Sequence, residues 1–344
     1  MTSSVTLIAI IVLVALAFDF INGFHDAANS IATVVATRVL SPHQAVLWAA
    51  AFNFLAVFVV GTGVAKTVGS GMIDLKYVTA QVILAGLIGA IVWDLTTWWF
   101  GLPTSSSHAL IGGYAGAAMA RVAHLRGVGH SFDALIAGAW INTLIFIFLA
   151  PLLGMVLAYL MMIAVYWLFR NSSPLRMDTF FRKLQLVSSA LLSFSHGGND
   201  AQKTAGVITG VLVASGTLKT FEMPKWVIFA AYGAIALGTL SGGWRIVHTM
   251  GSRLTRLKPR SGFCAETAAA ISILFATEYA HLPVSTTHVT AGAIAGVGSI
   301  QRLKAVRWGL ATNILWAWIL TLPAAASVGG ISMFLIQLFA SSGR

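Results

Sequence analysis

The feature that most constrains this chain is a series of apolar runs, many of them close to 20 residues long, separated by short polar stretches. A helix needs about 20 mostly apolar residues to cross the hydrocarbon core of a bilayer. Charged residues make up only 9% of the chain, whereas about a quarter of a soluble domain is charged. The sequence therefore predicts an all-α polytopic membrane protein with about ten transmembrane helices. The windows are 4–22, 44–65, 78–100, 132–150 and 151–169 in the first half, and 185–199, 225–242, 263–280, 307–322 and 323–340 in the second.

Two further segments, 103–120 and 283–299, are poor candidates for lipid-facing spans. Each begins with a proline, continues with hydroxyl residues and then becomes rich in glycine. Irregular backbone at membrane depth is tolerated only where protein or a water-filled cavity satisfies its polar groups. We therefore predict that these segments are re-entrant hairpins that line a site.

The same segments belong to an internal repeat. Residues 102–108, Leu-Pro-Thr-Ser-Ser-Ser-His, are matched at an offset of 180 by residues 282–288, Leu-Pro-Val-Ser-Thr-Thr-His. Residues 23–26, Gly-Phe-His-Asp, are matched at an offset of 174 by residues 197–200, Gly-Gly-Asn-Asp. This self-similarity predicts a duplication. An odd number of spans per copy would insert the second copy upside down, which is the inverted-repeat plan of many secondary transporters. The expected parts are a first repeat at 1–170, a cytoplasmic linker at 171–183 and a second repeat at 184–344.

Basic residues in the loops indicate an orientation, because cytoplasmic loops carry an excess of Lys and Arg. We expect the central loop to be cytoplasmic and both termini to lie outside. The net charge of +11 is spread over these loops and not gathered on one soluble domain, which argues against nucleic-acid binding. The residues expected inside include Arg38, Arg121, Arg126, Arg170, Arg176, Arg182, Lys183, Arg245, Arg253, Arg256, Lys258 and Arg260, whereas Arg302, Lys304 and Arg307 are expected outside.

Two aspartates stand out, since an ionisable group at bilayer depth is costly and usually faces a cavity or a partner. Asp26 and Asp200 hold equivalent places in the two repeats, and glycines beside them permit a broken helix. The free carbonyls and the carboxylate of a broken helix could hold a cation. Asp19, Asp94, Glu266 and Glu278 also lie in or beside apolar runs, but have no symmetric partner, and they are expected to be secondary ion ligands or buried ties between helices.

The hydroxyl runs predict an anion site. A helix that starts after Pro103 or Pro283 presents unpaired backbone N–H groups and several hydroxyls to one point. Two such helix ends, brought together by the repeat, would donate to a tetrahedral oxyanion from both sides. His108 and His288 follow the two runs and are expected to fix the shape of the hairpin tips.

At these residues the sequence resembles the inorganic phosphate transporter (PiT) family, and the resemblance covers nearly the whole chain. That family carries a duplicated motif G-x-N-D-x-x-N, which corresponds to residues 23–29 and 197–203, and paired L-P-x-S-[ST]-[ST]-H hairpins, which begin here at Leu102 and Leu282. The resemblance implies a phosphate symporter of the cell membrane with inverted repeats, usually a homodimer. Phosphate would be held between the hairpin tips and the broken helices.

Two departures from the family motif concern the coupling ion. His25 and Lys203 stand where sodium-linked members have Asn, a combination similar to the short bacterial proton-linked Pit-type low-affinity permeases, some of which are credited with carrying metal-phosphate. An ammonium at Lys203 would replace a bound cation with a fixed charge and pair with Asp200, Asp26 or phosphate. His25 titrates in the physiological range when unperturbed and is the expected proton-coupling group.

We therefore predict a secondary active transporter, not an enzyme, that imports phosphate by cation-coupled symport. A proton, or a divalent metal carried with phosphate, is favoured over sodium, and no covalently bound cofactor is expected. The predicted phosphate ligands are Ser105, Ser106, Ser107, Ser285, Thr286, Thr287, Asn29 and Lys203. The predicted coupling residues are His25, Asp26, Asn199 and Asp200.

Three alternatives stay open. A sulfate permease of the same family would also bind a tetrahedral anion, although only phosphate can keep a proton and donate a hydrogen bond to Asp26 or Asp200. An intramembrane hydrolase would use a Ser–His pair. Its arrangement occurs twice in this chain, which suits a symmetric binding site better than a single nucleophile. A passive anion channel is the third alternative.

Overall fold

The computed structural model describes residues 5–301 and 305–342. These residues form helices joined by short connections, and among them the only β-type pairing is an isolated bridge between Ile73 and Leu135. The prediction of an all-α protein is confirmed for this part of the chain.

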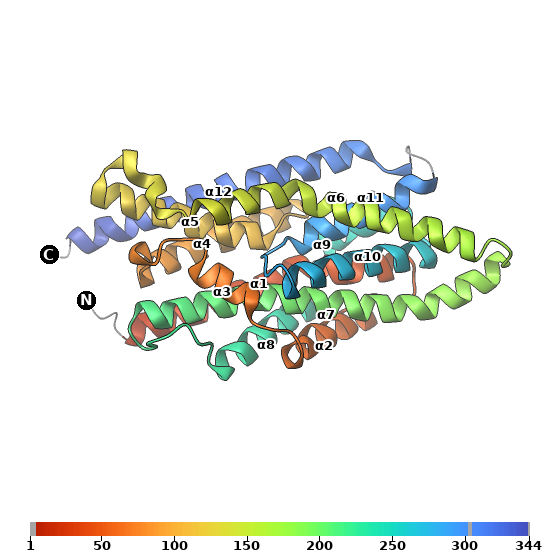
Figure 1. The fold of residues 1–344 in the computed structure, drawn as a ribbon, viewed down its shortest axis with the longest axis horizontal. Coiled ribbons are helices and arrows are strands. Elements are labelled where there is room, and N and C mark those ends of the chain that lie inside the picture. Colours follow the sequence, from red (N-terminus) through yellow and green to blue (C-terminus); the bar gives the residue numbers. More distant parts are fainter. Residues whose placement is uncertain (1–4, 302–304, 343–344) are drawn as a thin grey trace.

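The order of the elements recurs in the two halves of the chain (Figure 1). A long helix is followed by a bent pair of helices, two helices joined by a tight turn, and a second long helix. The first half contains α1 Val5–Ala36, α2 Pro42–Leu55, η1 Ala56–Phe58, α3 Gly63–Ser70, η2 Leu75–Tyr77, α4 Ala80–Phe100, α5 Ser106–Arg126, η3 Val128–Ala134 and α6 Ala137–Leu168. The second half contains α7 Pro174–Ala214, α8 Lys225–Ser241, α9 Trp244–His248, the π-helical turn η4 Thr249–Arg253, α10 Pro259–Glu278, α11 Thr286–Gln301 and α12 Trp308–Ser342.

The predicted count of about ten separate spans is too high. The windows 132–150 and 151–169 are one helix, α6, with Pro151 inside it, and 307–322 and 323–340 are one helix, α12, with Pro323 inside it. Neighbouring helices and local adjustments satisfy the backbone groups that such a proline frees. By length and composition, four helices of the described chain can cross a membrane alone, or up to six if each bent pair is one span.

The predicted hairpins 103–120 and 283–299 are not hairpins in themselves. Each is an extended stretch followed by one uninterrupted helix, α5 or α11. The hairpin is made with the preceding helix, since α4 packs along α5 and α10 packs along α11. Their apolar composition made α4 and α10 indistinguishable from independent spans in the sequence.

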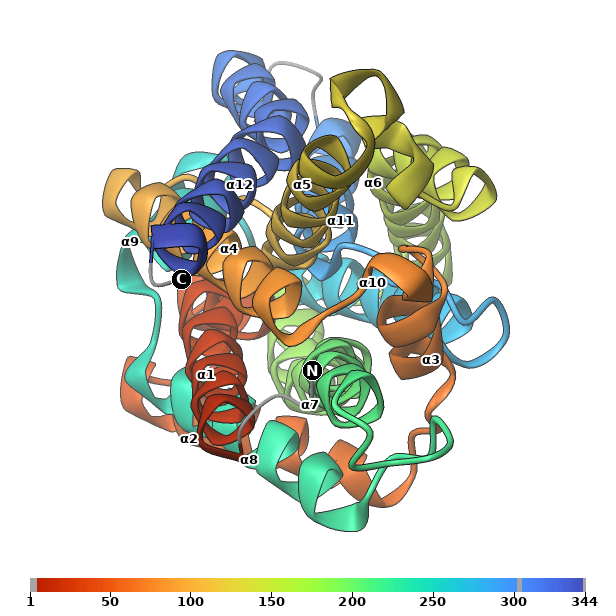
Figure 2. The ribbon, with the colours of Figure 1, turned by 90° about the vertical axis from the view of Figure 1, so that its left-hand side faces the viewer.

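The two helix hairpins lie between α1 and α7 on one side and α6 and α12 on the other (Figure 2). α5 packs along α12, and α11 packs along α6. A Cβ on Gly112 would collide with the carbonyl of Leu322, and one on Gly292 would collide with the carbonyl of Pro151. Small residues permit this backbone-to-backbone packing of membrane helices. The glycines after the hydroxyl runs therefore fix how closely the hairpins approach the long helices.

The ends of the molecule correct the expected sidedness of several loops. Both ends of the described chain lie at one end, and the turn between α6 and α7 lies at the other (Figure 1). The predicted linker 171–183 is helical from Pro174 onward, so the turn itself is only 169–173. Arg126 bonds Tyr77 and Asp133 at the end that carries the termini, not on the side of the central loop.

Arg307 is also on the other side from the one expected. Its backbone N–H donates to the Leu254 carbonyl at 3.0 Å, at the end that carries the α6–α7 turn. The reason is that α6 and α12 are each one span where the windows suggested two, which reverses the side of the loops before them. Arg302 and Lys304 lie outside the described residues.

Candidate functional site

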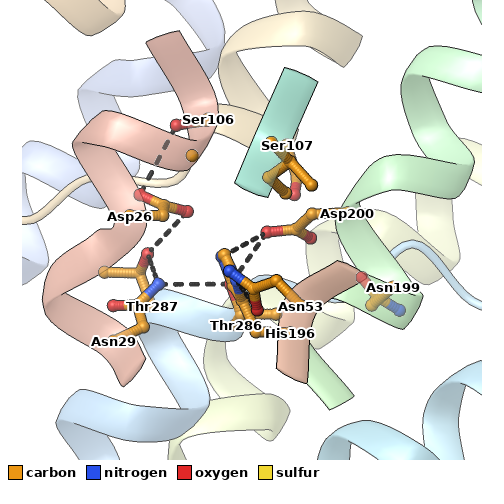
Figure 3. A network of polar contacts seen from close by, with 12 residues as sticks. Asp26, Asn29, Asn53, Ser106, Ser107, His196, Asn199, Asp200, Thr286 and Thr287 are labelled. Carbon is orange, nitrogen blue, oxygen red and sulfur yellow. Dashed lines mark hydrogen bonds and ion pairs between the residues drawn. The ribbon is translucent and has the colours of Figure 1, made fainter. Parts of the chain in front are cut away.

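The amino ends of α5 and α11 meet two buried aspartates near the centre of the molecule (Figure 3). The Ser106 hydroxyl lies 3.5 Å from Asp26 Oδ1, and the Thr287 hydroxyl donates to Asp26 Oδ2 at 3.3 Å. The Thr286 hydroxyl donates to Asp200 Oδ2 at 3.2 Å. All five side chains are buried. The structure thus brings both hydroxyl runs and both motif aspartates into one site.

Lys203 and Asn29, the last residues of the two motifs, make equivalent contacts across the site. The Lys203 ammonium donates to Asp200 Oδ1 and to the Ser107 hydroxyl. It also donates, at 3.0 Å, to the backbone carbonyl of Val284 in the α10–α11 turn. The Asn29 amide donates to Thr287 at 2.9 Å and to Thr286 at 3.2 Å. Each motif therefore reaches the hydroxyl run of the other half of the chain.

The two aspartates differ in the charges around them. Asp200 pairs with Lys203 and lies 3.1 Å from His196 Nε2. Asp26 lies 2.7 Å from His25 Nδ1. His196 was missed by the sequence reasoning, although its i, i+4 spacing to Asp200 places both on one helix face.

Two threonines on the hairpin arms were also missed. His25 Nε2 lies 3.1 Å from Thr97 Oγ1, and the Asn199 amide donates to Thr277 Oγ1 at 2.7 Å. Thr97 and Thr277 are separated by 180 residues, the same offset as the hydroxyl runs, and that spacing could have identified them. Near His25 there is an additional hydroxyl, that of Thr104, which donates to Thr97 at 2.9 Å. Asn199 therefore faces the α10 arm instead of either aspartate.

The serines that begin the runs, Ser105 and Ser285, act as helix caps. Their hydroxyls accept the backbone N–H groups of His108 and His288, each at 3.2 Å. An N-cap hydroxyl satisfies one of the free donors of the first helical turn. This use of their oxygens differs from the predicted role as direct phosphate ligands.

The two histidines join the hairpin tips by packing. The ring centroids of His108 and His288 are 4.8 Å apart, with an edge-to-face arrangement. His288 also stacks on Trp318 at 3.9 Å, and the Trp318 indole donates to the Pro103 carbonyl at 2.8 Å. The tips of the two hairpins are therefore tied to each other and to α12.

Three buried groups could hold a metal ion. Donor atoms of Asp26, His196 and Asp200 lie within 4.8 Å of one another. Carboxylate oxygens and imidazole nitrogens are common ligands of divalent cations. Hydroxyls, an ammonium and free helix ends beside these groups suit an oxyanion, so the arrangement can bind an anion and a cation together.

Comparisons with known proteins agree with this chemistry. Residues 22–329 match the profile of the Phosphate transporter family. The chain is 52% identical over 331 residues to a "Probable low-affinity inorganic phosphate transporter" of Rhizobium meliloti (strain 1021), with 96% of each chain covered. It is 42% identical over 333 residues to a protein of the same name from Bacillus subtilis (strain 168), with 96% of this chain and 97% of the relative covered.

A solved structure described as "The sodium-dependent phosphate transporter" has the same fold. The TM-score is 0.84, with 97% of this chain and 99% of that chain covered, at 24% sequence identity. The resemblance to the PiT family is thereby confirmed at the level of family and fold. The family profile and these relatives span nearly the whole chain, and the protein therefore belongs to the phosphate transporter family.

Proposed function

We propose that this protein is a secondary active transporter that binds inorganic phosphate between the amino ends of α5 and α11 and moves it across the membrane with a cation. One observation carries the proposal: two helix ends, their hydroxyls and the Lys203 ammonium converge on two buried aspartates. Membership of the phosphate transporter family supports phosphate as the substrate.

The side chains proposed to contact phosphate are those that now bond the aspartates or their neighbours. They are Ser106, Ser107, Thr286, Thr287, Asn29 and Lys203. Ser105 and Ser285 would contribute through the helix ends that they cap. Phosphate that keeps a proton can donate a hydrogen bond to Asp26 or Asp200, whereas fully ionised sulfate would face two carboxylates with no donor. This difference favours phosphate over sulfate.

The site does not favour the hydrolase alternative. Ser106 donates to Asp26, and Ser107 accepts from Lys203. His108 packs against His288. A serine nucleophile needs a base within hydrogen-bond reach of its hydroxyl, and among the described contacts neither serine has a histidine there.

Proton coupling, with metal-phosphate as the variant to test, is our proposal for the driving ion. Lys203 places a fixed ammonium where a bound cation would otherwise balance Asp200, and His25 hydrogen-bonds both Asp26 and Thr97. A proton on this His25–Asp26 pair would offset the charge of entering phosphate.

The test is uptake of radiolabelled phosphate into proteoliposomes. An inside-alkaline pH gradient without sodium should drive accumulation above that of protein-free liposomes, and a protonophore should abolish it. A parallel series with added Mg²⁺ shows whether the metal must accompany phosphate. Accumulation that follows a sodium gradient and ignores the pH gradient would contradict proton coupling.

Alternating access would require the two hairpin turns to open one after the other. In the structure each turn is held by one hydrogen bond from a neighbouring helical segment, and we call this bond a clasp. The Thr249 hydroxyl donates to the Gly101 carbonyl at 3.0 Å, and the Thr67 hydroxyl donates to the His281 carbonyl at 2.9 Å. Gly101 and His281 both have positive φ, 65° and 50°, and are 180 residues apart. Thr249 follows α9, whereas Thr67 lies on α3 (Figure 1). We propose that these two clasps are released in turn during transport.

Thr249→Val should loosen the α4–α5 turn alone, and the matched variant Thr67→Val should loosen the α10–α11 turn alone. Loss of one hydrogen bond of about 1 kcal/mol predicts roughly fivefold faster opening. Hydrogen–deuterium exchange of segments 97–105 and 277–285 measures this directly. Equal acceleration in both segments, or in neither, would count against separate clasps.

The remaining proposals concern placement. We propose that the protein lies in the cell membrane as a homodimer, as the resemblance implies. The end with the α6–α7 turn would be cytoplasmic, because basic residues gather there, and both termini would be outside. Among the described residues, Arg170 lies in that turn, Arg176, Arg182 and Lys183 lie in the first part of α7, and Arg182 bonds the Arg38 carbonyl.

A further inference from the structure

We propose that Asp94 is a further ligand of the transport site, and that it forms with Asp26 a binding position for a hard metal cation. This inference rests on the metal-coupled form of the proposed cotransport, in which a metal ion instead of a proton balances the charge beside Asp26, and it names a residue that would hold that ion. Asp94 lies on α4, on the arm that leads to the first hairpin turn.

The Asp94 carboxylate is buried without a partner. Its exposed fraction is 0%, and among the described residues no donor meets hydrogen-bond geometry with either carboxylate oxygen. Asp94 lies one turn before Thr97 on α4, the Thr97 hydroxyl lies 3.1 Å from His25 Nε2, and the other nitrogen of His25 bonds Asp26. A buried charge without compensation costs several kcal/mol. A carboxyl group held in this way either keeps a proton or binds a cation.

The surroundings of the two motif aspartates differ in charge, and this difference indicates where a cation would bind. We call the surroundings of Asp26 the first side of the site and those of Asp200 the second side. On the second side, Asp200 has Lys203 and His196 as partners. At the offset of 174, the equivalents of Lys203 and His196 are Asn29 and Asn22, which carry no charge.

The first side also has an additional acid. The residue 180 positions after Asp94 is Leu274, so the second side has no counterpart of this carboxylate. The second side thus contains a fixed ammonium, whereas among the described residues Asp26 is paired with the imidazole of His25 and with no lysine or arginine. Asp19, a further buried carboxylate without a hydrogen-bond partner, lies two turns before Asp26 on α1. A mobile cation is therefore expected between Asp26 and Asp94.

The donor atoms favour a hard cation. Carboxylate and hydroxyl oxygens are the ligands that Mg²⁺ and similar ions prefer. Ser106 offers such a hydroxyl, since it hydrogen-bonds Asp26. Because Ser106 begins α5, a cation held here would lie beside the proposed phosphate position, and each ion would favour binding of the other.

The test measures binding of ²²Na⁺ and ⁵⁴Mn²⁺, the latter as a label for the Mg²⁺ class, to the purified protein without phosphate. Asp94→Asn should weaken binding of the ion that the wild type binds by about 10- to 100-fold, the range found even for residues that only orient a metal ligand. Asp94→Glu should restore part of it. The control is Asp74→Asn, because Asp74 is an exposed carboxylate that pairs with Lys76 at 2.6 Å.

Stability gives a second measurement. Asp94→Asn removes an uncompensated buried charge, so its melting temperature in cation-free buffer should equal or exceed that of the wild type. Wild-type protein that binds neither ion, or an Asp94→Asn variant that binds as the wild type does, would overturn the inference. If phosphate uptake nevertheless depends on a cation, the proposed function stands without it. Uptake that depends on no cation would refute the proposed cotransport itself.

Discussion

Lys203→Met is expected to abolish phosphate uptake and to lower the stability of the protein by about 3–5 kcal/mol, the usual cost of breaking a buried ion pair from one side. The ammonium is 1% exposed and is bonded to Asp200, to Ser107 and to the carbonyl of Val284. Its removal leaves the Asp200 carboxylate without its ammonium partner and with the His196 imidazole 3.1 Å away. Thermal unfolding in detergent and uptake into proteoliposomes measure the two effects separately.

The double variant Lys203→Met/Asp200→Asn separates stability from function. Removing both charges together leaves no uncompensated ion, so the melting temperature should return most of the way to that of the wild type. Uptake should stay lost, because the proposed phosphate contact and the partner carboxylate are both absent. If Lys203→Met is as stable as the wild type, or if the double variant is no more stable than Lys203→Met, then Lys203 does not compensate the buried charge of Asp200.

The repeat allowed much of the site to be predicted, because equal offsets identify equivalent positions without any knowledge of the fold. Asp26, Asp200, Lys203 and the hydroxyl runs do converge, and they do so around the amino ends of two helices. The role of each hydroxyl, as a helix cap or as a partner of an aspartate, could not be predicted. Ser105 becomes a cap because its position precedes the first helical turn, and the sequence does not fix that boundary to a single residue.

The membrane topology was predicted less well, for a physical reason. A window of about 20 apolar residues tests whether a segment can cross the bilayer, not where its helix begins or ends. α6, with 32 residues, therefore counted as two spans, and the α4–α5 hairpin was not apparent because α4 alone is long and apolar enough to cross the membrane. His196 was missed because it lies outside the repeated motif, and only the helix face that it shares with Asp200 connects it to the site.

Asp26→Asn and Asp200→Asn are each expected to reduce phosphate uptake about 100-fold or more, measured at equal amounts of folded protein. Asp200→Asn breaks the buried pair with Lys203 from the other side, so it should lower stability to a degree similar to that of Lys203→Met. Asn has nearly the same shape, so the helix packing around each position is kept. The negative charge that receives the hydroxyl hydrogen bonds is lost. At Asp26 the donors are Ser106 and Thr287, and at Asp200 they are the Thr286 hydroxyl and the Lys203 ammonium. Hydrogen bonds to a charged group are worth about 1.5–3 kcal/mol each, so two of them account for a change of this size.

The two variants should differ in what remains. Asp26→Asn leaves His25 without its carboxylate partner, so the variant should lose the response of uptake to a pH gradient as well as the rate. Asp200→Asn leaves Lys203 bonded to Ser107 and Val284, so weak phosphate binding to the extra positive charge should persist without transport. Asp133→Asn, at an exposed carboxylate that pairs with Arg126, is the matched control and should transport normally. Wild-type uptake by either folded aspartate variant would remove that residue from the transport site, and identical behaviour of the two would argue against separate roles for the anion and cation sides.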